Sequence, residues 1–522
     1  MPDALLTARR LATLAWALIR FGLPLLGRRI VRPRRGDPEL PVRFRRALEE
    51  MGLTYLKLGQ YLAMRFDILP AEVCRELGRL FDEVPPMPFE TSRAVVEQEL
   101  AGPLEQRFAR FDSQPLAAAS VAQVHRAATL DGEEVAVKVQ RPGITRVFET
   151  DIRILRAITR AADALQLLGR LSVTEMLDEF ARWTMRETDF LQEARTAERV
   201  GANPPPYEVE PDVRWDLTTA RVLTLEFIEG VTLAQIIRVI ERDGEQAAVQ
   251  QIPGLDVELV LHHLSFASLR QIFVTGLFHG DPHPGNILVL SDNRVAFVDF
   301  GIFGELSRYD REILGAQIEQ LAIGNIDESL RAYAKQLSLT PESDPRAFRR
   351  EARGVLREWY ELSLRTDSPT AERHLGRYIG RMIDISRRHR LLYDMSFLLY
   401  WRALNALDST ALRMSSSFDL MRELRSFFER LRPGLAARLA DLTLDEHTWS
   451  IVRSLVMDAP DRMRFALDGL SDGRFEGTVA VSERESERRV RDGGARRLAG
   501  ALAAVSALVL CVALAALVGA RA

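Results

Sequence analysis

The stretch that decides the fold is HGDPHPGN at residues 279–286, followed by DFG at residues 299–301. Asp281 has the chemistry to orient or deprotonate an attacking hydroxyl group or water molecule. Asn286, five positions later, and Asp299 offer the hard oxygen atoms that Mg²⁺ prefers when it bridges phosphate groups. The stretch therefore predicts a site for phosphoryl transfer, with Asp281 as a catalytic residue and the other two as metal ligands.

Two further features indicate a fold of the protein-kinase type. The segment EEVAVK, residues 133–138, closes an apolar strand with a lysine. In protein kinases a V-A-x-K strand supplies the lysine that holds the α- and β-phosphates. A catalytic loop with Asp and Asn five positions apart follows it, and a D-F-G comes after the loop, the order found here. The apolar runs 287–290 and 295–298 flank a polar turn and predict a β-hairpin between the two motifs. Lys138 is therefore expected to be catalytic.

With its other motifs, the sequence resembles the UbiB-like atypical kinases (UbiB, aarF and ADCK-type proteins). The resemblance rests on K-x-G-Q at residues 57–60, an alanine-rich loop at 116–125 and E-x-D at 187–189, in addition to the motifs above. It runs from about Met51 to beyond Gly304, roughly half of the chain.

The resemblance implies a role for each motif. Glu193 is the helix carboxylate expected to pair with the strand lysine. The residues implied to contact the nucleotide are Ala117, Ala118, Ala119, Ser120, Lys138 and Glu226. The residues implied to close the site are Lys57 and Gln60, on a helical extension held by the carboxylates Glu187 and Asp189. The implied cofactors are ATP or ADP, with Mg²⁺.

Some features of peptide-directed kinases are missing from the sequence. No G-x-G-x-x-G precedes Lys138, no A-P-E follows the D-F-G, and Gly280 stands where H-R-D would have arginine. Without the A-P-E segment, a platform for an extended peptide is not expected. We therefore expect the acceptor to be water or a small, lipid-like molecule.

Composition narrows the class of protein further. The chain has 522 residues and a net charge of −3, so no overall basic excess indicates nucleic acid binding. Its only two cysteines, Cys74 and Cys511, exclude a disulfide framework and a cysteine-based zinc site. Lysine is rare: of 70 basic residues only Lys57, Lys138 and Lys335 are lysines, and the first two fall inside motifs.

Both ends of the chain indicate a membrane. Residues 1–50 are rich in arginine between apolar runs, which favours a basic amphipathic segment on an anionic surface; a solvated helix packed on the body is the alternative. Residues 498–520 carry no charge and are long enough for one transmembrane helix. The arginines in the charged linker 481–497 place the body in the cytoplasm, at the inner membrane.

The sequence thus predicts an α+β, two-lobed protein-kinase-like fold with an N-terminal helical extension, a C-terminal helical region and one C-terminal transmembrane helix. The remaining predicted parts are the K-x-G-Q extension 51–110, the small lobe 111–230, the large lobe 231–345 and the helical region 346–480.

The predicted function is that of a membrane-associated atypical kinase or ATPase supporting ubiquinone or related lipid-quinone biosynthesis. Its expected partners are membrane lipids, isoprenoid quinone precursors and quinone-biosynthesis enzymes. Two alternatives stay open at this point: a nucleotide-binding pseudokinase scaffold, and a true protein kinase.

Overall fold

The computed structural model describes residues 3–17, 19–20, 40–65, 69, 71–81, 85–164, 173–339, 343–363 and 375–441. They form one compact unit up to Glu423 and part of a second that begins at Leu424. The predicted linker 481–497 and the predicted transmembrane helix 498–520 lie outside the described residues. Among the helices that are described, none has the length and apolar character needed to cross a bilayer.

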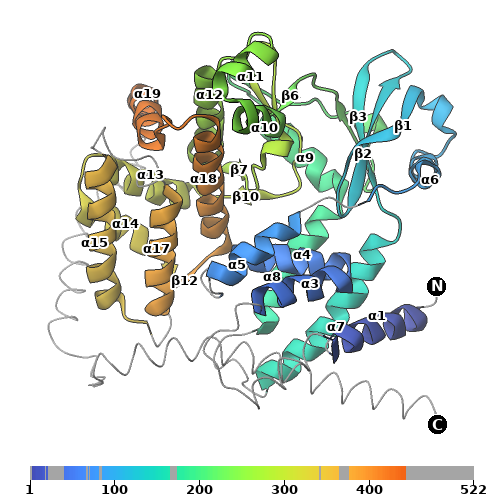
Figure 1. Cartoon of the computed structure of the whole chain (residues 1–522), viewed down its shortest axis with the longest axis horizontal. Helices are drawn as coiled ribbons and strands as arrows, with labels where there is room; N and C mark the ends of the chain where they lie inside the picture. The colour runs from blue at the N-terminus through green and yellow to red at the C-terminus, as the bar shows by residue number, and fades with distance from the viewer. Residues whose placement is uncertain are drawn as a thin grey trace. The chain divides into compact units, whose positions relative to one another are not determined.

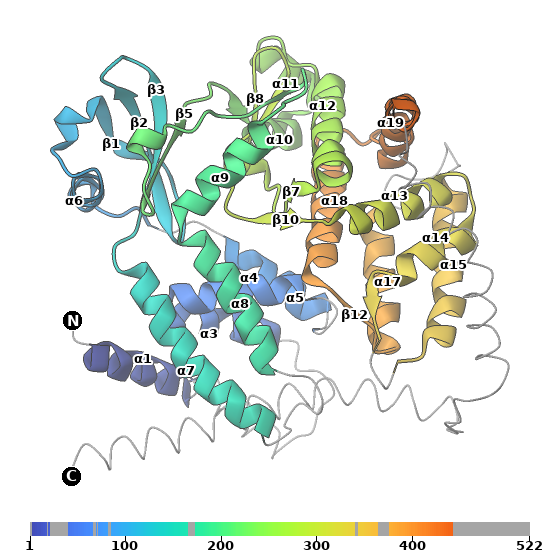
Figure 2. The ribbon, with the colours of Figure 1, turned by 180° about the vertical axis from the view of Figure 1, so that it is seen from behind.

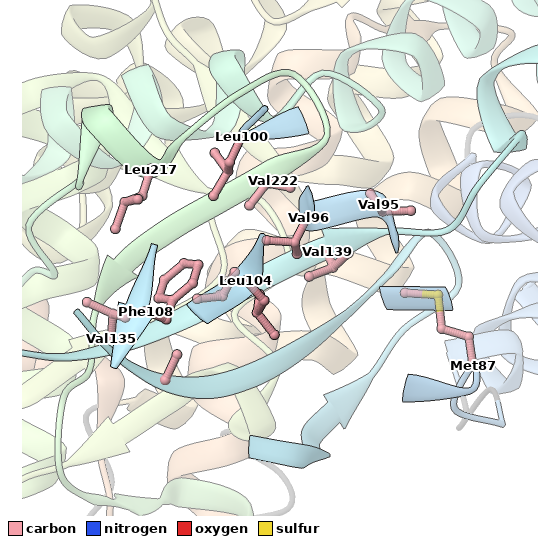
Figure 3. Packing of buried hydrophobic residues seen from close by; sticks show 12 residues of the cluster. Met87, Val95, Val96, Leu100, Leu104, Phe108, Val135, Val139, Leu217 and Val222 are labelled. Carbon is pink, nitrogen blue, oxygen red and sulfur yellow. The ribbon is translucent and has the colours of Figure 1, made fainter. Parts of the chain in front are cut away.

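A four-stranded antiparallel sheet of order β1-β2-β3-β5 forms the small lobe (Figure 1). Its strands are β1 (Phe108–Ala118), β2 (Ala122–Thr129), β3 (Glu134–Gln140) and β5 (Val222–Glu226). Side chains alternate across a strand, and in β3 the valines 135, 137 and 139 are fully buried on one face. That face packs against α6 (Phe89–Glu99) (Figure 3). Lys138 therefore projects from the opposite face of the sheet.

The segment predicted as the K-x-G-Q extension contains two parts that pack differently. Its first part consists of α4 (Leu53–Met64), α5 (Ala71–Leu77) and the 3₁₀ turn η2 (Gly78–Phe81), which share an apolar cluster with α1 (Asp3–Ala17) and α3 (Leu40–Met51). Its second part is α6, followed by η3 (Leu104–Gln106). It belongs to the small lobe because Val95 and Val96 are buried against the sheet.

Three helices follow β3 in the chain. They are α7 (Ile144–Ala164), α8 (Val173–Glu187) and α9 (Phe190–Gly201). Seen from behind, α7 and α8 lie beside α4, whereas α9 lies beside the small sheet and contacts β5 (Figure 2). The chain breaks its helix at Thr188-Asp189, where the Asp189 side chain caps α9 by accepting a hydrogen bond from Leu191 N.

The large lobe carries the catalytic loop between small sheets and helices. Its strands are β4 (Glu208–Val209), β6 (Val231–Thr232), β7 (Leu277–His279), β8 (Ile287–Val289), β9 (Val295–Phe297) and β10 (Phe303–Glu305). Its helical elements are α10 (Leu233–Asp243), α11 (Glu245–Gln251), α12 (Val257–Arg270), the π-helical turn η5 (Gln271–Thr275) and the 3₁₀ turn η6 (Pro284–Asn286). The 3₁₀ turn η4 (Trp215–Leu217) lies beside β5 and belongs to the small lobe, because Leu217 is buried in its core. The antiparallel pairing of β8 with β9 confirms the predicted hairpin, with Asn293 at φ 64° in its turn.

A predominantly helical region follows. Its elements are α13 (Arg308–Ala322), α14 (Ile326–Ala334), β11 (Leu337–Ser338), α15 (Pro345–Ser363), α17 (Leu375–Arg388), β12 (Leu392–Tyr393), α18 (Met395–Met414) and α19 (Leu420–Asp441). Helix α18 contacts α10 and α12 of the large lobe, strand β10 after the D-F-G, and helix α4 of the extension. The helical region is therefore in contact with the elements that carry the motifs.

Candidate active site

Lys138 lies at the centre of the site. Its ammonium Nζ is 2.6 Å from Oε1 of Glu193 on α9 and 2.9 Å from Oδ1 of Asp299. The same Glu193 oxygen accepts a hydrogen bond of 3.3 Å from the backbone N–H of Phe300. The structure thus brings together the strand lysine, its expected helix partner and the D-F-G aspartate, which are far apart in the sequence.

Lys138, Glu193 and Asp299 shift one another's pKa values. Burial alone would lower the pKa of Lys138, but Asp299 and Glu193 outweigh burial and raise it. Burial would raise the pKa of Asp299, yet the Lys138 charge dominates and lowers it. For Glu193 burial prevails over the lysine, and its pKa rises to about 7. Near neutral pH the site therefore holds an ammonium, an ionised Asp299 and a Glu193 that can gain or lose a proton.

The proposed metal ligands lie side by side. Asn286, at the end of η6, donates from Nδ2 to Oδ2 of Asp299 at 3.3 Å. An ionised carboxylate and an amide oxygen suit Mg²⁺, which usually takes one or two protein ligands and completes its octahedron with water and phosphate oxygens. These residues therefore fit the metal.

The catalytic loop is held by its own backbone and histidines. His279 Nδ1 accepts from the backbone N–H of Asp281 at 3.1 Å, and Gly280 N–H donates to the carbonyl of Ile302 at 2.8 Å. His283 Nδ1 accepts from Gly285 N–H at 3.1 Å. None of these contacts uses the Asp281 carboxylate, which projects from the loop.

The Asp281 carboxylate has a partner that sequence reasoning missed. Arg402, on α18, places a guanidinium nitrogen 2.8 Å from Oδ1 of Asp281. No motif surrounds Arg402, and it lies more than a hundred residues after the catalytic loop. Only the packing of α18 against the large lobe brings the two together.

The K-x-G-Q helix is joined to the site, although not through every predicted contact. Lys57 on α4 forms a buried ion pair with Glu187 at the end of α8, as expected. Gln60 instead donates to the carbonyl of Leu80 at 3.1 Å. Asp189 acts as the cap of α9. Of the two E-x-D carboxylates, Glu187 thus contacts the extension directly. Asp189 lies just before α9, where its side chain accepts a hydrogen bond from a backbone N–H group at the start of that helix.

The alanine-rich segment is mostly strand. Ala117 and Ala118 end β1 and pair with Val124 and Gln123 of β2. Ala119 and Ser120 lie in the turn, where Ala119 N–H donates to Ala122 O at 2.8 Å.

Arg141 also reaches this turn and donates to the Ala119 carbonyl at 3.1 Å. Glu226, at the end of β5, accepts from Asp212 N–H at 3.3 Å. Its carboxylate therefore contacts the Asp212 segment, and the nucleotide contact implied for Glu226 stays a prediction.

Comparison with known proteins relates the chain to a family of kinase-like proteins. Residues 79–332 match the ABC1 atypical kinase-like domain, a span that contains Lys138, Glu193 and Asp299 but neither Lys57 nor Arg402. A probable protein kinase UbiB of Azotobacter vinelandii is 30% identical over 80% of this chain and 76% of its own length. The chloroplastic protein ACTIVITY OF BC1 COMPLEX KINASE 8 of Arabidopsis thaliana is 36% identical over 60% of this chain.

Similarity to longer and to solved proteins is more limited. The chain spans 40% of the Arabidopsis protein and 48% of a Synechocystis relative, so it covers less than half of each. A solved structure, that of Rv3197 with erythromycin from Mycobacterium tuberculosis, matches 68% of this chain and 87% of its own at 25% identity and a TM-score of 0.47. The match to UbiB covers most of both chains at 30% identity, and the chain therefore belongs to the ABC1/UbiB family of atypical kinase-like proteins.

Proposed function

We propose that this protein is a membrane-associated atypical kinase or ATPase that transfers the γ-phosphoryl group of Mg-ATP to water or a small, lipid-like acceptor. The observation that carries the proposal is the contact of Lys138 with both Glu193 and Asp299, with Asn286 next to Asp299. A protein that only binds partners has no need for this combination of a lysine, its orienting carboxylate and a pair of metal ligands.

Each residue of the set has a task in the transfer. Lys138, oriented by Glu193, would hold the α- and β-phosphates, and Asp299 with Asn286 would hold Mg²⁺, which neutralises phosphate charge when bound. The acceptor oxygen forms a bond to the γ-phosphorus as the bond to the β,γ-bridging oxygen breaks, and that electron pair leaves with ADP. The acceptor's proton passes to the Asp281 carboxylate and then to solvent.

The surroundings of the site favour a small acceptor over a peptide. Helix α4 is tied to α8 by the Lys57–Glu187 pair, and the charges of Asp299 and Lys138 are close enough to affect the pKa of Glu187. After the D-F-G the chain forms only β10 before α13 begins at Arg308. This leaves little chain for the extended segment on which protein kinases bind peptides.

The quinone and membrane parts of the proposal rest on resemblance and on the ends of the chain. The UbiB-like family implies support of ubiquinone or related lipid-quinone biosynthesis, with isoprenoid quinone precursors and quinone-biosynthesis enzymes as partners. The basic segment 1–50 and the uncharged segment 498–520 would keep the body on the cytoplasmic side of the inner membrane.

The test is Mg²⁺-dependent ATP hydrolysis by the full chain on anionic liposomes, with and without a phenolic quinone precursor. We expect turnover that rises with liposomes or precursor and is abolished in Asp281→Asn. A fluorescent nucleotide should still bind to that variant. Nucleotide binding without turnover in the wild type under every condition would favour the scaffold alternative.

A further inference from the structure

Arg402 contacts the proposed base from outside the part of the chain that matches the kinase-like domain. Its guanidinium lies 2.8 Å from Asp281 Oδ1, and the two side chains are only 15% and 19% exposed. An ion pair in such a weakly hydrated place is stronger than one at the surface, because less water screens the two charges. Arg402 is therefore suited to fix the orientation of this carboxylate.

The packing of α18 explains how the arginine reaches the loop. Leu399, one turn before Arg402 on the same face of α18, touches the backbone at Gly280: a Cβ atom there would lie 3.1 Å from Leu399 Cδ2 and 3.1 Å from Ile302 Cγ2. Glycine at position 280 thus permits the close approach of α18 to the catalytic loop. Because position 280 is glycine, the loop lacks the arginine that an H-R-D motif has at this position.

Helix α18 is a rigid support for this contact. It is buried on several sides, with Leu398, Tyr400 and Leu404 each at most 1% exposed. Arg402 is therefore presented by a packed helix, whereas a loop residue would have more freedom to move.

We propose that Arg402 is a positioning residue for Asp281. By occupying Oδ1, its guanidinium turns Oδ2 towards the place where the acceptor's hydroxyl group or water must lie. The proposal rests on the phosphoryl transfer proposed above and adds to it that the C-terminal helical region completes the active site. Because Arg402 acts on the carboxylate and not on the nucleotide, its loss affects the chemical step and leaves nucleotide affinity unchanged.

The experiment compares Arg402→Ala and Arg402→Lys with Arg413→Ala, an exposed arginine on the same helix that pairs with Glu241. ATP turnover on anionic liposomes, nucleotide affinity and thermal stability are measured for each. We expect Arg402→Ala to lower kcat about 100-fold, the usual cost of misplacing a reacting group by about an ångström. Nucleotide affinity should change less than about twofold, and Arg413→Ala should behave as the wild type.

Chemical rescue separates positioning from a merely structural role. Guanidinium ion at low millimolar concentration should restore part of the Arg402→Ala rate, whereas urea at the same concentration should not. Arg402→Lys should retain an intermediate rate because it keeps the charge but not the planar fork. An Arg402→Ala variant with full kcat, or a loss without rescue, overturns the inference and leaves the proposed function standing. A wild type without turnover overturns both.

Discussion

Lys57 and Glu187 form a buried ion pair that joins the K-x-G-Q helix α4 to the last turn of α8, with Lys57 also 5.7 Å from the ring of Trp183. Burial, opposed by Lys57, raises the pKa of Glu187. Asp299 and Lys138 act on the same carboxylate. This pair therefore links the extension to the charges of the candidate active site.

Lys57→Met should destabilise the fold. Removing one partner of a buried pair leaves an uncompensated charge and typically costs about 3–5 kcal/mol. Urea unfolding should show this loss, and the double variant Lys57→Met/Glu187→Met should recover much of it. Lys335→Met is the matched control, since Lys335 is exposed at the end of α14. Equal stability of the Lys57 variant and this control would contradict a buried pair.

The scarcity of lysine allows a direct test of nucleotide placement. The chain has three lysines, so an acylating reagent can modify each, and mass spectrometry then measures the rate of modification at each position. Lys335 should react first because it is exposed, and Lys138 slowly because its raised pKa keeps it protonated. Mg-ATP should slow Lys138 further without affecting Lys335. If saturating Mg-ATP left the labelling rate of Lys138 unchanged, the phosphates of the nucleotide would bind away from Lys138.

Much of this site was predictable because kinase-type motifs specify both residue type and spacing. The strand lysine, Glu193, Asn286 and Asp299 meet as expected, since the alternation of β3 and the β8–β9 hairpin follow from local sequence. Arg402 was not predictable, because its role depends on the packing of a helix that carries no motif.

Two other residues make contacts that the motifs did not predict. Asp189 precedes a helix with free backbone N–H groups and therefore acts as a cap. Gln60 lies near Leu80 because α4 packs on η2, which no pattern in residues 51–81 indicates. A local helix cap decided the first contact, and tertiary packing decided the second.

The raised pKa of Glu193 predicts a pH dependence of stability. Its folded value of about 7 exceeds the ordinary value of 4.5, so the folded protein holds this proton more tightly than the unfolded chain does. The stabilisation is complete below about pH 4.5 and is lost as the pH rises through about 7. Glu193→Gln cannot titrate and should show a flatter decline.

Thermal unfolding of the nucleotide-free protein between about pH 5 and pH 8 measures this difference. Other buried carboxyl groups with raised pKa values, such as Glu187 and Glu210, contribute to the decline in both proteins. Only the difference between wild type and variant therefore reports on Glu193. Parallel curves would show that Glu193 keeps an ordinary pKa in the folded state.

The N-terminal helix offers a last prediction, on how α1 is attached to the body. Arg10 donates to both carboxylate oxygens of Asp151 on α7, at 2.7 and 2.6 Å, and to the carbonyl of Met51 at 3.0 Å. The Asp151 side chain is fully buried, and Leu14 of the same helix is 5% exposed. One face of α1 therefore packs on the body, while Leu5 and Trp16 remain exposed.

Arg10→Met should free α1 and leave a buried, unpaired Asp151, at a cost of about 3–5 kcal/mol in the free energy of unfolding. The exposed neighbour Arg9 provides the control, and Arg9→Met should change that free energy by less than about 0.5 kcal/mol. Limited proteolysis should cut the Arg10 variant within residues 3–17 faster than the control, because a detached helix unfolds locally. Equal cutting rates and equal stability would mean that α1 is held to the body by its apolar face alone.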